Sequence, residues 1–545
     1  MPRMSPVRTV LLVLLAACLQ AHAGPREEVV RTGRVYADQD GNLRQGPGEP
    51  GLAGVAVSNG RVVVHSDARG DYRIPVAPGD IAFVVKPAGW QVQVGGDGLP
   101  RFWWREPSPS PSPSPAEGAS AVGMRPDRDF ALRRARLPEQ GRGQPLQVLV
   151  FADPQVKSMR DVSFYARDIV DPLRRAPRAD LGLTLGDVVD DVLSLYPAIN
   201  AVTTRLGVPW LHAPGNHDVD AGAAGDGGSL ETYRRVFGPD TYAWEEAAAT
   251  FLVLDDVITL PGRRPAYLGG LREDQFDFLA AYLPRIPRDR LLVLALHIPL
   301  FDTAADGAPE TFRSADRARL FALLHDFPHV LVLSGHRHGQ RHDFHGAADG
   351  WHGARPLHEY SVGAASGAYW SGIEDAEGIP DATMADGTPN GHARLEIGAK
   401  GAYRLSWHPA RQPSHDPAFT GAMALHAPKV LRQGAYPGSG VYANVFMGHA
   451  ATRVEYRVDA GAWRPMTRVE QPDPRLLVEN VRDDLADTLR GYDRAPEAEP
   501  SQHLWRGTLP TDLAAGVHEV EVRAFDDWQG EQRARIRYRL DAASP

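Results

Sequence analysis

Five short apolar runs, each ended by a polar cluster, constrain the fold of this chain more than any other feature. The runs are residues 146–151, 181–185, 208–211, 291–296 and 330–333. Apolar runs of this length, bounded by Gly, Pro and polar residues, are typical of strands that are buried on both faces of a sheet. Because the ligands of such α/β sheets bind just beyond the carboxyl ends of the strands, we expect the clusters to meet at one edge.

The clusters together hold the donor groups of a metal site. In chain order they are Asp153-Pro154-Gln155, Gly186-Asp187, Gly215-Asn216-His217-Asp218, His297 and Gly335-His336-Arg337-His338. Carboxylate and amide oxygens and imidazole nitrogens are all established metal ligands. The sequence therefore predicts a metal centre at this edge of the sheet, with enough donors for two ions.

The length and charge of the chain limit its class. At 545 residues, of which 43% are apolar, it is long enough for about three domains with packed cores. The formal net charge is −9, and no basic stretch is interleaved with aromatic residues. This pattern argues against a nucleic-acid-binding surface.

The N-terminus has the pattern of an export signal. Two arginines precede an apolar run at 10–17, and Ala21-His22-Ala23 offers a cleavage site. We therefore expect residues 1–23 to be a signal peptide and the mature protein to be periplasmic or secreted. An alternative stays open, because the segment that ends at Cys18 also resembles a bacterial lipobox, which predicts a lipoprotein with a lipid anchor at Cys18. No other segment is apolar enough to be transmembrane.

Two β-rich regions flank the metal-bearing region. Residues 24–105 contain short strands and an Asn59-Gly60 hairpin signal, which predict an N-terminal β-sandwich. Residues 106–125 form a Pro/Ser-rich linker that cannot build a core. Within 144–395, apolar runs alternate with helical stretches, as expected of an α/β domain. Period-two alternation returns in 412–542, where we predict a second β-sandwich.

The clusters, taken in their order, resemble the motifs of the calcineurin-like metallophosphoesterases. All five family motifs are present. Gln155 stands where the family usually has His, but some branches of the family also have Gln at this position. The resemblance implies a four-layer α/β-sandwich metallophosphoesterase domain, flanked in this chain by two all-β sandwich domains. The flanking regions and the loop at 366–372 resemble a secreted bacterial branch with N- and C-terminal β-sandwich domains.

The resemblance also implies a ligand set for two divalent ions. One ion would be held by Asp153, Gln155, Asp187 and His338, and the other by Asp187, Asn216, His297 and His336. Asp187 would bridge the two ions. The mixture of imidazole and oxygen donors suits Mn, Fe or Zn better than Ca. Two divalent ions outweigh two carboxylates in charge, so the loaded site would attract the phosphate of an ester substrate.

By the same resemblance, a metal-bridging hydroxide would attack the phosphate ester, with His217 as the general acid. Asp218 is expected to orient the His217 imidazole or to raise its pKa. Tyr369 and Trp370 follow the last ligand in a loop and are candidates for substrate binding, with core packing an equal alternative for Trp370. Arg337 is left outside the catalytic set. Structural roles are expected for His212, His325, His329, His342 and His345.

The sequence thus predicts an exported two-metal phosphoesterase, with phosphomonoesters and phosphodiesters equally compatible as substrates. A rival interpretation is a surface- or polymer-binding protein whose phosphoesterase domain has decayed. The complete ligand set favours the enzyme, because decay would be expected to remove at least one ligand.

Overall fold

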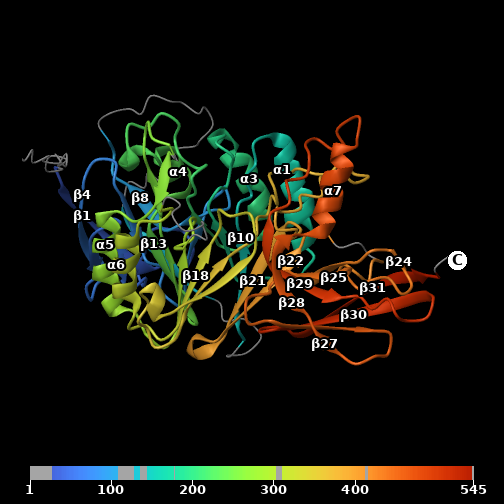
Figure 1. Cartoon of the computed structure of the whole chain (residues 1–545). Helices are drawn as coiled ribbons and strands as arrows, with labels where there is room; N and C mark the ends of the chain where they lie inside the picture. The colour runs from blue at the N-terminus through green and yellow to red at the C-terminus, as the bar shows by residue number, and fades with distance from the viewer. Residues whose placement is uncertain are drawn as a thin grey trace, which may run out of the picture.

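The computed structural model describes residues 27–108, 128–135, 144–176, 178–264, 266–301, 310–411 and 415–542. The N-terminal and C-terminal strands lie at opposite ends of a central α/β domain (Figure 1). The predicted signal peptide, Cys18 and most of the predicted linker lie outside the described residues. Within the described residues, no helix is long and apolar enough to cross a membrane.

Two β-sheets form the centre of the α/β domain. The first contains, in spatial order, β12 (Trp210–Ala213), β11 (Leu181–Leu185), β10 (Leu146–Phe151), β21 (Gly391–Ile397) and β22 (Tyr403–Pro409). The second contains β13 (Tyr242–Glu245), β14 (Ala249–Val253), β17 (Leu291–Ala295), β18 (Val330–Ser334), β20 (Leu357–Ser361) and β19 (Arg341–His345). The five predicted runs are the parallel strands β10, β11, β12, β17 and β18, with β12 shifted by about two residues. Because parallel strands share one direction, their carboxyl ends meet at one edge.

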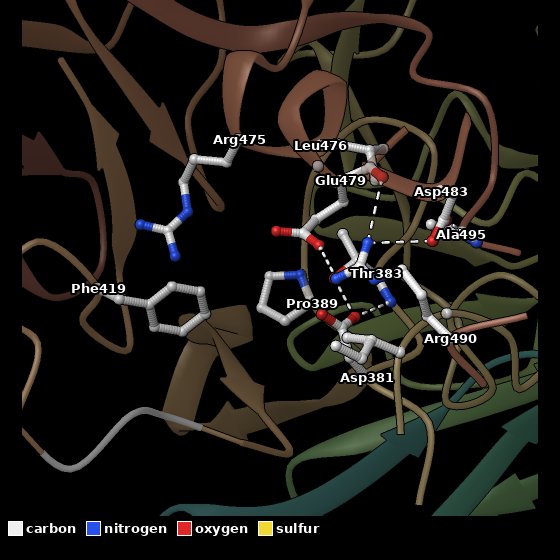
Figure 2. A pocket seen from close by; sticks show the side chains of 13 residues that line it. Asp381, Thr383, Pro389, Phe419, Arg475, Leu476, Glu479, Asp483, Arg490 and Ala495 are labelled. Carbon is white, nitrogen blue, oxygen red and sulfur yellow. Dashed lines mark hydrogen bonds and ion pairs between the residues drawn. The ribbon is translucent and has the colours of Figure 1, made fainter. Parts of the chain in front are cut away.

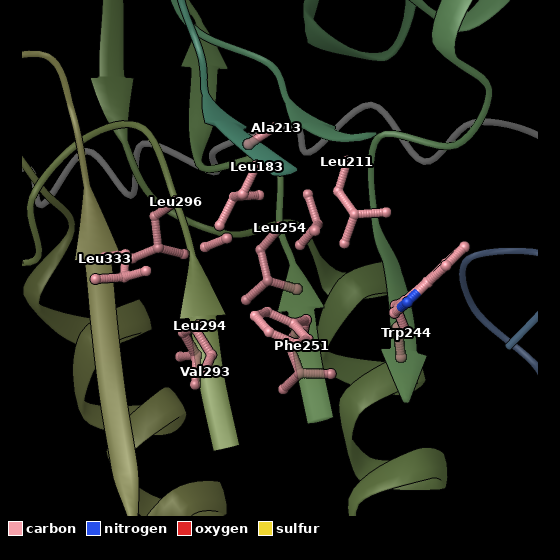
Figure 3. Close-up of a cluster of buried hydrophobic side chains, with 14 of the residues drawn as sticks. Leu183, Leu211, Ala213, Trp244, Phe251, Leu254, Val293, Leu294, Leu296 and Leu333 are labelled. Atoms are coloured by element: carbon pink, nitrogen blue, oxygen red, sulfur yellow. The ribbon is translucent and has the colours of Figure 1, made fainter. Parts of the chain in front are cut away.

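The two sheets pack face to face, and their strands alternate between an inner and an outer core. Val148 of β10 lies in the core between the sheets, whereas its neighbour Leu149 packs toward the helices. Figure 3 shows the inner core, where Leu183 of the first sheet approaches Leu254 and Leu296 from the second. Burial on both faces explains why these strands read as uninterrupted apolar runs.

Helices cover the outer faces of both sheets. The first sheet is covered by α1 (Met159–Tyr165), a π-helical segment (Ala166–Val170), α2 (Asp171–Leu173) and α3 (Tyr196–Thr203). The second is covered by α5 (Glu273–Tyr282) and α6 (Ser314–Leu324), as Figure 1 shows. The short helix α4 (Glu231–Phe237) and the hairpin of β15 (Val257–Thr259) and β16 (Tyr267–Gly269) complete the domain. The predicted four-layer α/β sandwich is confirmed.

The N-terminal region contains two further sheets. One is formed by β4 (Asp71–Val76), β1 (Val29–Ala37), β9 (Phe130–Arg134), β6 (Trp90–Val94) and β7 (Pro100–Arg101), and the other by β3 (Val63–His65), β2 (Ala56–Ser58), β5 (Ile81–Val84) and β8 (Trp103–Arg105). Strand β9 lies beyond the predicted end of this domain at 105, because the chain returns after the linker to pair in parallel with β1. The domain also packs on the α/β domain, where the ring centroids of Phe83 and Phe278 are 6.0 Å apart.

The C-terminal region is built from another pair of sheets. One contains β23 (Met423–His426), β25 (Gly440–Val445), β29 (Pro500–Thr508) and β28 (Thr467–Pro472), and the other β24 (Val430–Arg432), β31 (Gly530–Asp541), β30 (Gly516–Asp526), β26 (Arg453–Val458) and β27 (Arg464–Pro465). The predicted end of the α/β domain at 395 is wrong, because it falls within β21, and β22 is needed to complete the first sheet. These two antiparallel strands alternate apolar and polar residues, as the C-terminal strands do, so their pattern did not separate the domains.

Helix α7 (Pro474–Asp484) lies over the loop that follows β20, with a small pocket between them (Figure 2). The pocket has a volume of about 120 Å³ and is lined by Asp381 and Thr383 of the loop and by Glu479 and Asp483 of α7. Arg490 donates to Glu479 at 2.8 Å and to Asp483 at 3.0 Å. None of the predicted metal ligands lines this pocket, so it is separate from the predicted centre.

Candidate metal centre

The five clusters meet at the carboxyl edge of the two sheets, where the backbone is strained. Five of the predicted ligands have a positive φ, namely Asp153 (47°), Gln155 (45°), Asp187 (48°), His336 (72°) and His338 (48°). Residues other than glycine rarely adopt this conformation, and it concentrates at functional sites. The backbone therefore points to the same edge that the polar clusters do.

Glycines beside the ligands allow the clusters to come into contact. A Cβ atom at Gly215 would lie 2.2 Å from Oδ1 of Asp187. At Gly186, where φ is 88°, a Cβ atom would lie 2.5 Å from Nδ1 of His297. Any side chain at either position would displace a predicted ligand, so both need glycine.

His297 is fully buried, and main-chain contacts fix its ring. Its Nδ1 donates to the carbonyl of Leu185 at 2.8 Å, so Nε2 is the atom that can bind a metal. Nε2 lies 3.0 Å from Oδ1 of Asn216, 3.3 Å from Oδ2 of Asp187 and 3.2 Å from Nδ1 of His336. Donor atoms from four different strand ends thus converge on one point.

The surroundings of His297 favour positive charge. Burial lowers the pKa of His297, but the carboxylates of Asp187 and Asp153 raise it to about 10. Asp256, fully buried, accepts the main-chain N–H groups of His297 and Ile298, each at 3.0 Å. Asp256 was missed in the sequence, although it follows the apolar run of β14 as the predicted ligands follow theirs. Asp256 therefore stabilises the turn that contains His297.

The remaining ligands are packed less closely. Asp153 is fully buried, and Nε2 of His338 lies 3.8 Å from its Oδ1. The Nδ1 atom of His338 donates to the carbonyl of Gly367 at 2.6 Å, which leaves Nε2 to bind a metal. Gln155 donates from Nε2 to Oδ2 of Asp187 at 3.4 Å, while its buried Oε1 has no hydrogen-bond donor among the described residues.

These donors fit a pair of transition-metal ions. Asp187, His297 and His336 each offer an atom within 4.8 Å of the other two. The buried Oε1 of Gln155 is an acceptor that a metal would satisfy. Imidazole nitrogens combined with carboxylate and amide oxygens are the donor mixture expected for Mn, Fe or Zn. The fold gathers all seven predicted ligands, Asp153, Gln155, Asp187, Asn216, His297, His336 and His338, at one edge.

His217 lies beside this group with its ring held by two acidic residues. Its main-chain N–H donates to Oδ1 of Asp187 at 2.8 Å. Its Nδ1 lies 3.0 Å from Oδ1 of Asp191 and 3.2 Å from Oδ1 of Asp190. Burial lowers the pKa of His217, but the charges of Asp187, Asp191 and Asp190 outweigh it and raise the pKa. The sequence did not single out the two neighbouring acids.

The predicted contact from Asp218 to the His217 ring is wrong. Asp218 is fully buried, and its carboxylate accepts the N–H of Gly215 at 2.9 Å and the hydroxyl of Tyr196 at 2.9 Å. A third hydrogen bond comes from the N–H of Val188 at 3.2 Å. Asp218 therefore ties together the turns after β11 and β12 instead of orienting the imidazole.

Comparison with known families matches all three regions of the chain. Residues 146–340 match the model of the calcineurin-like phosphoesterase, residues 39–112 the N terminal of calcineurin-like phosphoesterase, and residues 359–532 the C terminal of calcineurin-like phosphoesterase. The chain belongs to the calcineurin-like phosphoesterase family. It is a metal-dependent phosphoester hydrolase, as its motifs predict.

Similar solved structures are distant from this phosphoesterase. A purple acid phosphatase from yellow lupin (Lupinus luteus) seeds is 15% identical, with a TM-score of 0.37 over 71% of this chain and 67% of that chain. The phosphopantetheinyl hydrolase of Mycobacterium tuberculosis is 13% identical, with a TM-score of 0.27 over 41% of this chain and 91% of that chain. No curated protein matches the sequence significantly.

Aromatic residues border the candidate metal centre of this phosphoesterase. Tyr369 is 49% exposed, and its ring stacks on His338 with centroids 4.5 Å apart. Tyr267, which was not predicted, meets His336 edge-on at 5.8 Å between centroids. Trp370 is buried and donates from Nε1 to the carbonyl of Pro154 at 2.9 Å. Substrate contact by Trp370 is therefore wrong, because its ring packs behind the Asp153-Pro154-Gln155 turn.

Three of the five histidines expected to be structural form hydrogen bonds with groups other than the predicted metal ligands. Nδ1 of His342 lies 3.0 Å from Nε2 of His358, and Nε2 of His345 lies 2.7 Å from Oε2 of Glu359. His325 bonds the carbonyl of Ala322 at 2.8 Å.

Proposed function

We propose that this protein hydrolyses phosphate esters outside the cytoplasm, using two transition-metal ions that share Asp187. The observation that carries the proposal is a convergence on His297, because donor atoms of Asp187, Asn216 and His336 lie 3.0–3.3 Å from its Nε2. The unpaired Oε1 of Gln155 supports a second ion beside the first.

The residues at this edge would hold the two ions and set the net charge of the site. Asp187 is buried, and its Oδ1 accepts the main-chain N–H of His217 while its Oδ2 faces Nε2 of His297. These two contacts fix its carboxylate relative to the other proposed ligands. When bound, two divalent ions would supply an activated water and polarise the phosphoryl oxygens. Only Asp153 and Asp187 among the seven ligands are anionic, so the loaded site keeps a net positive charge that attracts phosphate.

His217 is the proposed proton donor to the leaving oxygen. Asp191 and Asp190 bind its Nδ1, which keeps Nε2 available for a proton directed at substrate. The same two carboxylates favour the protonated ring. This arrangement supports general-acid catalysis, in which a leaving alkoxide departs with a proton.

Export and substrate contact belong to the same proposal. The segment 1–23 has the features of a signal peptide, and Cys18 remains a candidate for lipidation. Tyr369, half exposed beside His338, is a candidate for substrate contact. Phosphomonoesters and phosphodiesters both suit a positive two-metal site.

The proposal is tested by metal analysis combined with turnover of chromogenic esters. Purified protein should hold close to two transition-metal ions per chain and should hydrolyse nitrophenyl phosphate, bis-nitrophenyl phosphate or both. Chelation should abolish turnover, and Mn, Fe or Zn should restore it. Protein that holds no metal, and that hydrolyses neither ester after Mn, Fe or Zn is added, would instead favour the decayed, binding-only interpretation. The ratio of the two ester rates distinguishes a monoesterase from a diesterase.

A further inference from the structure

The loop between β1 and β2 carries a second acidic cluster, in the N-terminal domain. One carboxylate oxygen from each of Asp38, Asp40 and Glu49 lies within 4.8 Å of the other two. Asp38 and Glu49 are buried, whereas Asp40 is exposed. Among the described residues, no Lys or Arg forms an ion pair with these carboxylates.

Asp38 distinguishes this cluster from an ordinary acidic surface. Its side chain is 2% exposed. Oδ1 accepts the N–H of Gly41 at 2.8 Å, but Oδ2 is buried and accepts no hydrogen bond from the part of the chain that the structure describes. Buried polar atoms are almost always satisfied by a donor, a water or a cation, and burying an unpaired charge is strongly unfavourable. Oδ2 therefore needs a partner that the described residues do not supply.

The spacing of oxygen-bearing side chains matches a calcium-binding loop. In the EF-hand loop, side-chain ligands stand at positions 1, 3, 5 and 12, and glycine stands at position 6 for a sharp turn. Counted from Asp38, these ligand positions are Asp38, Asp40, Asn42 and Glu49. Position 6 is Leu43, whose φ of 64° is the conformation that normally requires glycine. The loop follows a strand instead of a helix, so the likeness lies in the loop alone.

The internal hydrogen bonds of the loop leave capacity for an ion. Glu49 accepts the N–H groups of Gln39 and Asp40 at 2.7 and 3.4 Å through Oε1, and that of Gly46 at 2.8 Å through Oε2. A carboxylate has about four lone-pair sites, so Oε2 can accept further. Arg133 lies beside Gly41, where a Cβ atom would be 3.4 Å from its Cζ, and its charge opposes a cation. Arg134 also lines a cavity with Asp38 and Arg133, and three carboxylates outweigh these two guanidinium groups.

We propose that Asp38, Asp40, Asn42 and Glu49 bind one Ca²⁺ ion. All the donors are carboxylate or amide oxygens, which hard cations prefer. Ca²⁺ accepts six to eight such oxygens in flexible geometry, whereas Mg²⁺ demands a near-ideal octahedron and keeps its waters. The site differs in this from the metal centre, where three histidines select softer ions.

A bound Ca²⁺ would close the loop onto β1. The N–H of Ala37 donates to the carbonyl of Pro50 at 2.9 Å, and Tyr36 forms a β-bridge with Gly51. The loop therefore leaves and rejoins the domain at the same point, with the acidic residues between. Calcium stabilises the N-terminal domain, and it does so without any of the catalytic ligands.

The experiment is calorimetric titration of the metal-loaded, full mature protein with CaCl₂ after dialysis against calcium-depleted buffer, with thermal unfolding in parallel. We expect one Ca²⁺ per chain with a Kd of about 10⁻⁴ M, in the range of weak calcium modules. Mg²⁺ should bind at least about tenfold more weakly. Saturating calcium should raise the unfolding midpoint, because the ion binds the folded loop only.

Variants separate this site from the metal centre. Asp38→Asn and Asp40→Ala should each weaken calcium binding at least tenfold, and Asp40 is exposed, so its replacement carries little risk to folding. Asp67→Asn is the matched control, since Asp67 also accepts loop N–H groups in this domain, at 2.8 and 2.9 Å, but stands outside the cluster. Asp67→Asn and Asp187→Asn should both keep calcium binding. The proposal is overturned by wild-type protein that neither binds nor responds to 10 mM Ca²⁺ (about a hundredfold above the expected Kd), or by unchanged affinity in Asp40→Ala and Asp38→Asn.

Discussion

The predicted metal ligands around Asp187 form two groups, and the donor atoms of one group lie closer together than those of the other. In the His297 group, formed by Asn216, His297 and His336, the donor atoms already lie 3.0 and 3.2 Å from Nε2 of His297. In the Gln155 group, formed by Asp153, Gln155 and His338, the corresponding separation between His338 and Asp153 is 3.8 Å. The side-chain oxygen of Gln155 accepts no hydrogen bond from any residue that the structure describes.

This difference has a chemical cause. The His297 ring is fixed through Nδ1 by Leu185, and its turn is held by the buried Asp256. Outer contacts of this kind orient a ligand and strengthen metal binding. Both groups contain a neutral amide, but Oδ1 of Asn216 lies 3.0 Å from Nε2 of His297, whereas Oε1 of Gln155 has no hydrogen-bond partner among the described residues. We therefore expect the His297 group to bind its ion more tightly than the Gln155 group binds the other ion.

The largest effect is expected from the residue that both groups share. Asp187→Asn removes the only carboxylate proposed to touch both ions, so most of both metals and nearly all activity should be lost. Elemental analysis of the purified variant measures this. Asp190→Asn is the matched control, because Asp190 is a nearby carboxylate outside the ligand set and should keep both ions. Full metal occupancy in Asp187→Asn would contradict the bridging role.

The next largest effect concerns His217, which serves neither group as a ligand. His217→Ala should slow hydrolysis of alkyl phosphoesters by about 10²–10⁴-fold, because an alkoxide leaves slowly without a proton. Nitrophenyl esters should be affected much less, since nitrophenolate leaves unaided, and metal content should stay near two. Equal losses on both substrates with metals retained would mean that His217 binds phosphate instead of donating a proton.

Gln155 tests the weaker group alone. Gln155→Ala should lower the affinity for one of the two ions by about 10–100-fold and leave the other ion in place. Replacing a residue that only supports a metal ligand already costs that much affinity. Gln155→His should restore the second ion and shift preference toward Zn, because imidazole is the softer donor. Titration of metal-depleted protein with each ion measures both effects. Unchanged metal content and activity in Gln155→Ala would exclude Gln155 as a ligand.

Asp256 gives the reciprocal test on the firmer group. Asp256→Asn keeps the size of the side chain but sets an amide NH₂ group against main-chain N–H donors. We expect affinity for one ion to fall about tenfold, with the Gln155 group unaffected. Comparing Asp256→Asn, Gln155→Ala and the double variant shows whether they act on different ions. If both single variants weaken the same ion, the division into two groups is wrong.

The parts of this centre that the sequence predicts are those in which a ligand directly follows an apolar strand. The runs that end at Asp153, Asp187 and His297 are visible in the sequence, and their parallel arrangement brings the ends together. Asp256 has the same local signal, an apolar run followed by an acid. Its carboxylate, however, accepts the main-chain N–H groups of His297 and Ile298 and does not join the predicted ligands. Local pattern does not separate these two roles.

Other features depend on long-range contacts that leave no local pattern. Asp190 and Asp191 reach His217 because the turn after β11 folds toward the turn after β12. Asp218 follows His217 directly, yet its carboxylate faces Tyr196. Strands β9 and β22 join sheets whose other strands lie far away in the chain, so their membership follows only from the pairing.

The smallest expected effect concerns Tyr369, and it distinguishes substrate contact from support of the Gln155 group. Its half-exposed ring stacks on His338, so it can act either on a substrate or on that ligand. An aromatic contact contributes about 0.5–1.5 kcal/mol, which corresponds to a change of roughly 2- to 10-fold. If Tyr369 binds substrate, Tyr369→Ala should raise KM by that factor while metal content and kcat stay near wild type.

The matched control is Tyr436→Ala, since Tyr436 is a 91% exposed tyrosine of the C-terminal domain and should change neither quantity. Steady-state kinetics at saturating metal and elemental analysis at limiting metal separate the two roles of Tyr369. Loss of one ion at limiting metal, with KM restored when metal is saturating, would show that Tyr369 supports His338. The Gln155 group would then depend on an exposed aromatic ring as well as on the main-chain contact of His338 with Gly367, and the difference in metal affinity between the two groups would have a second cause.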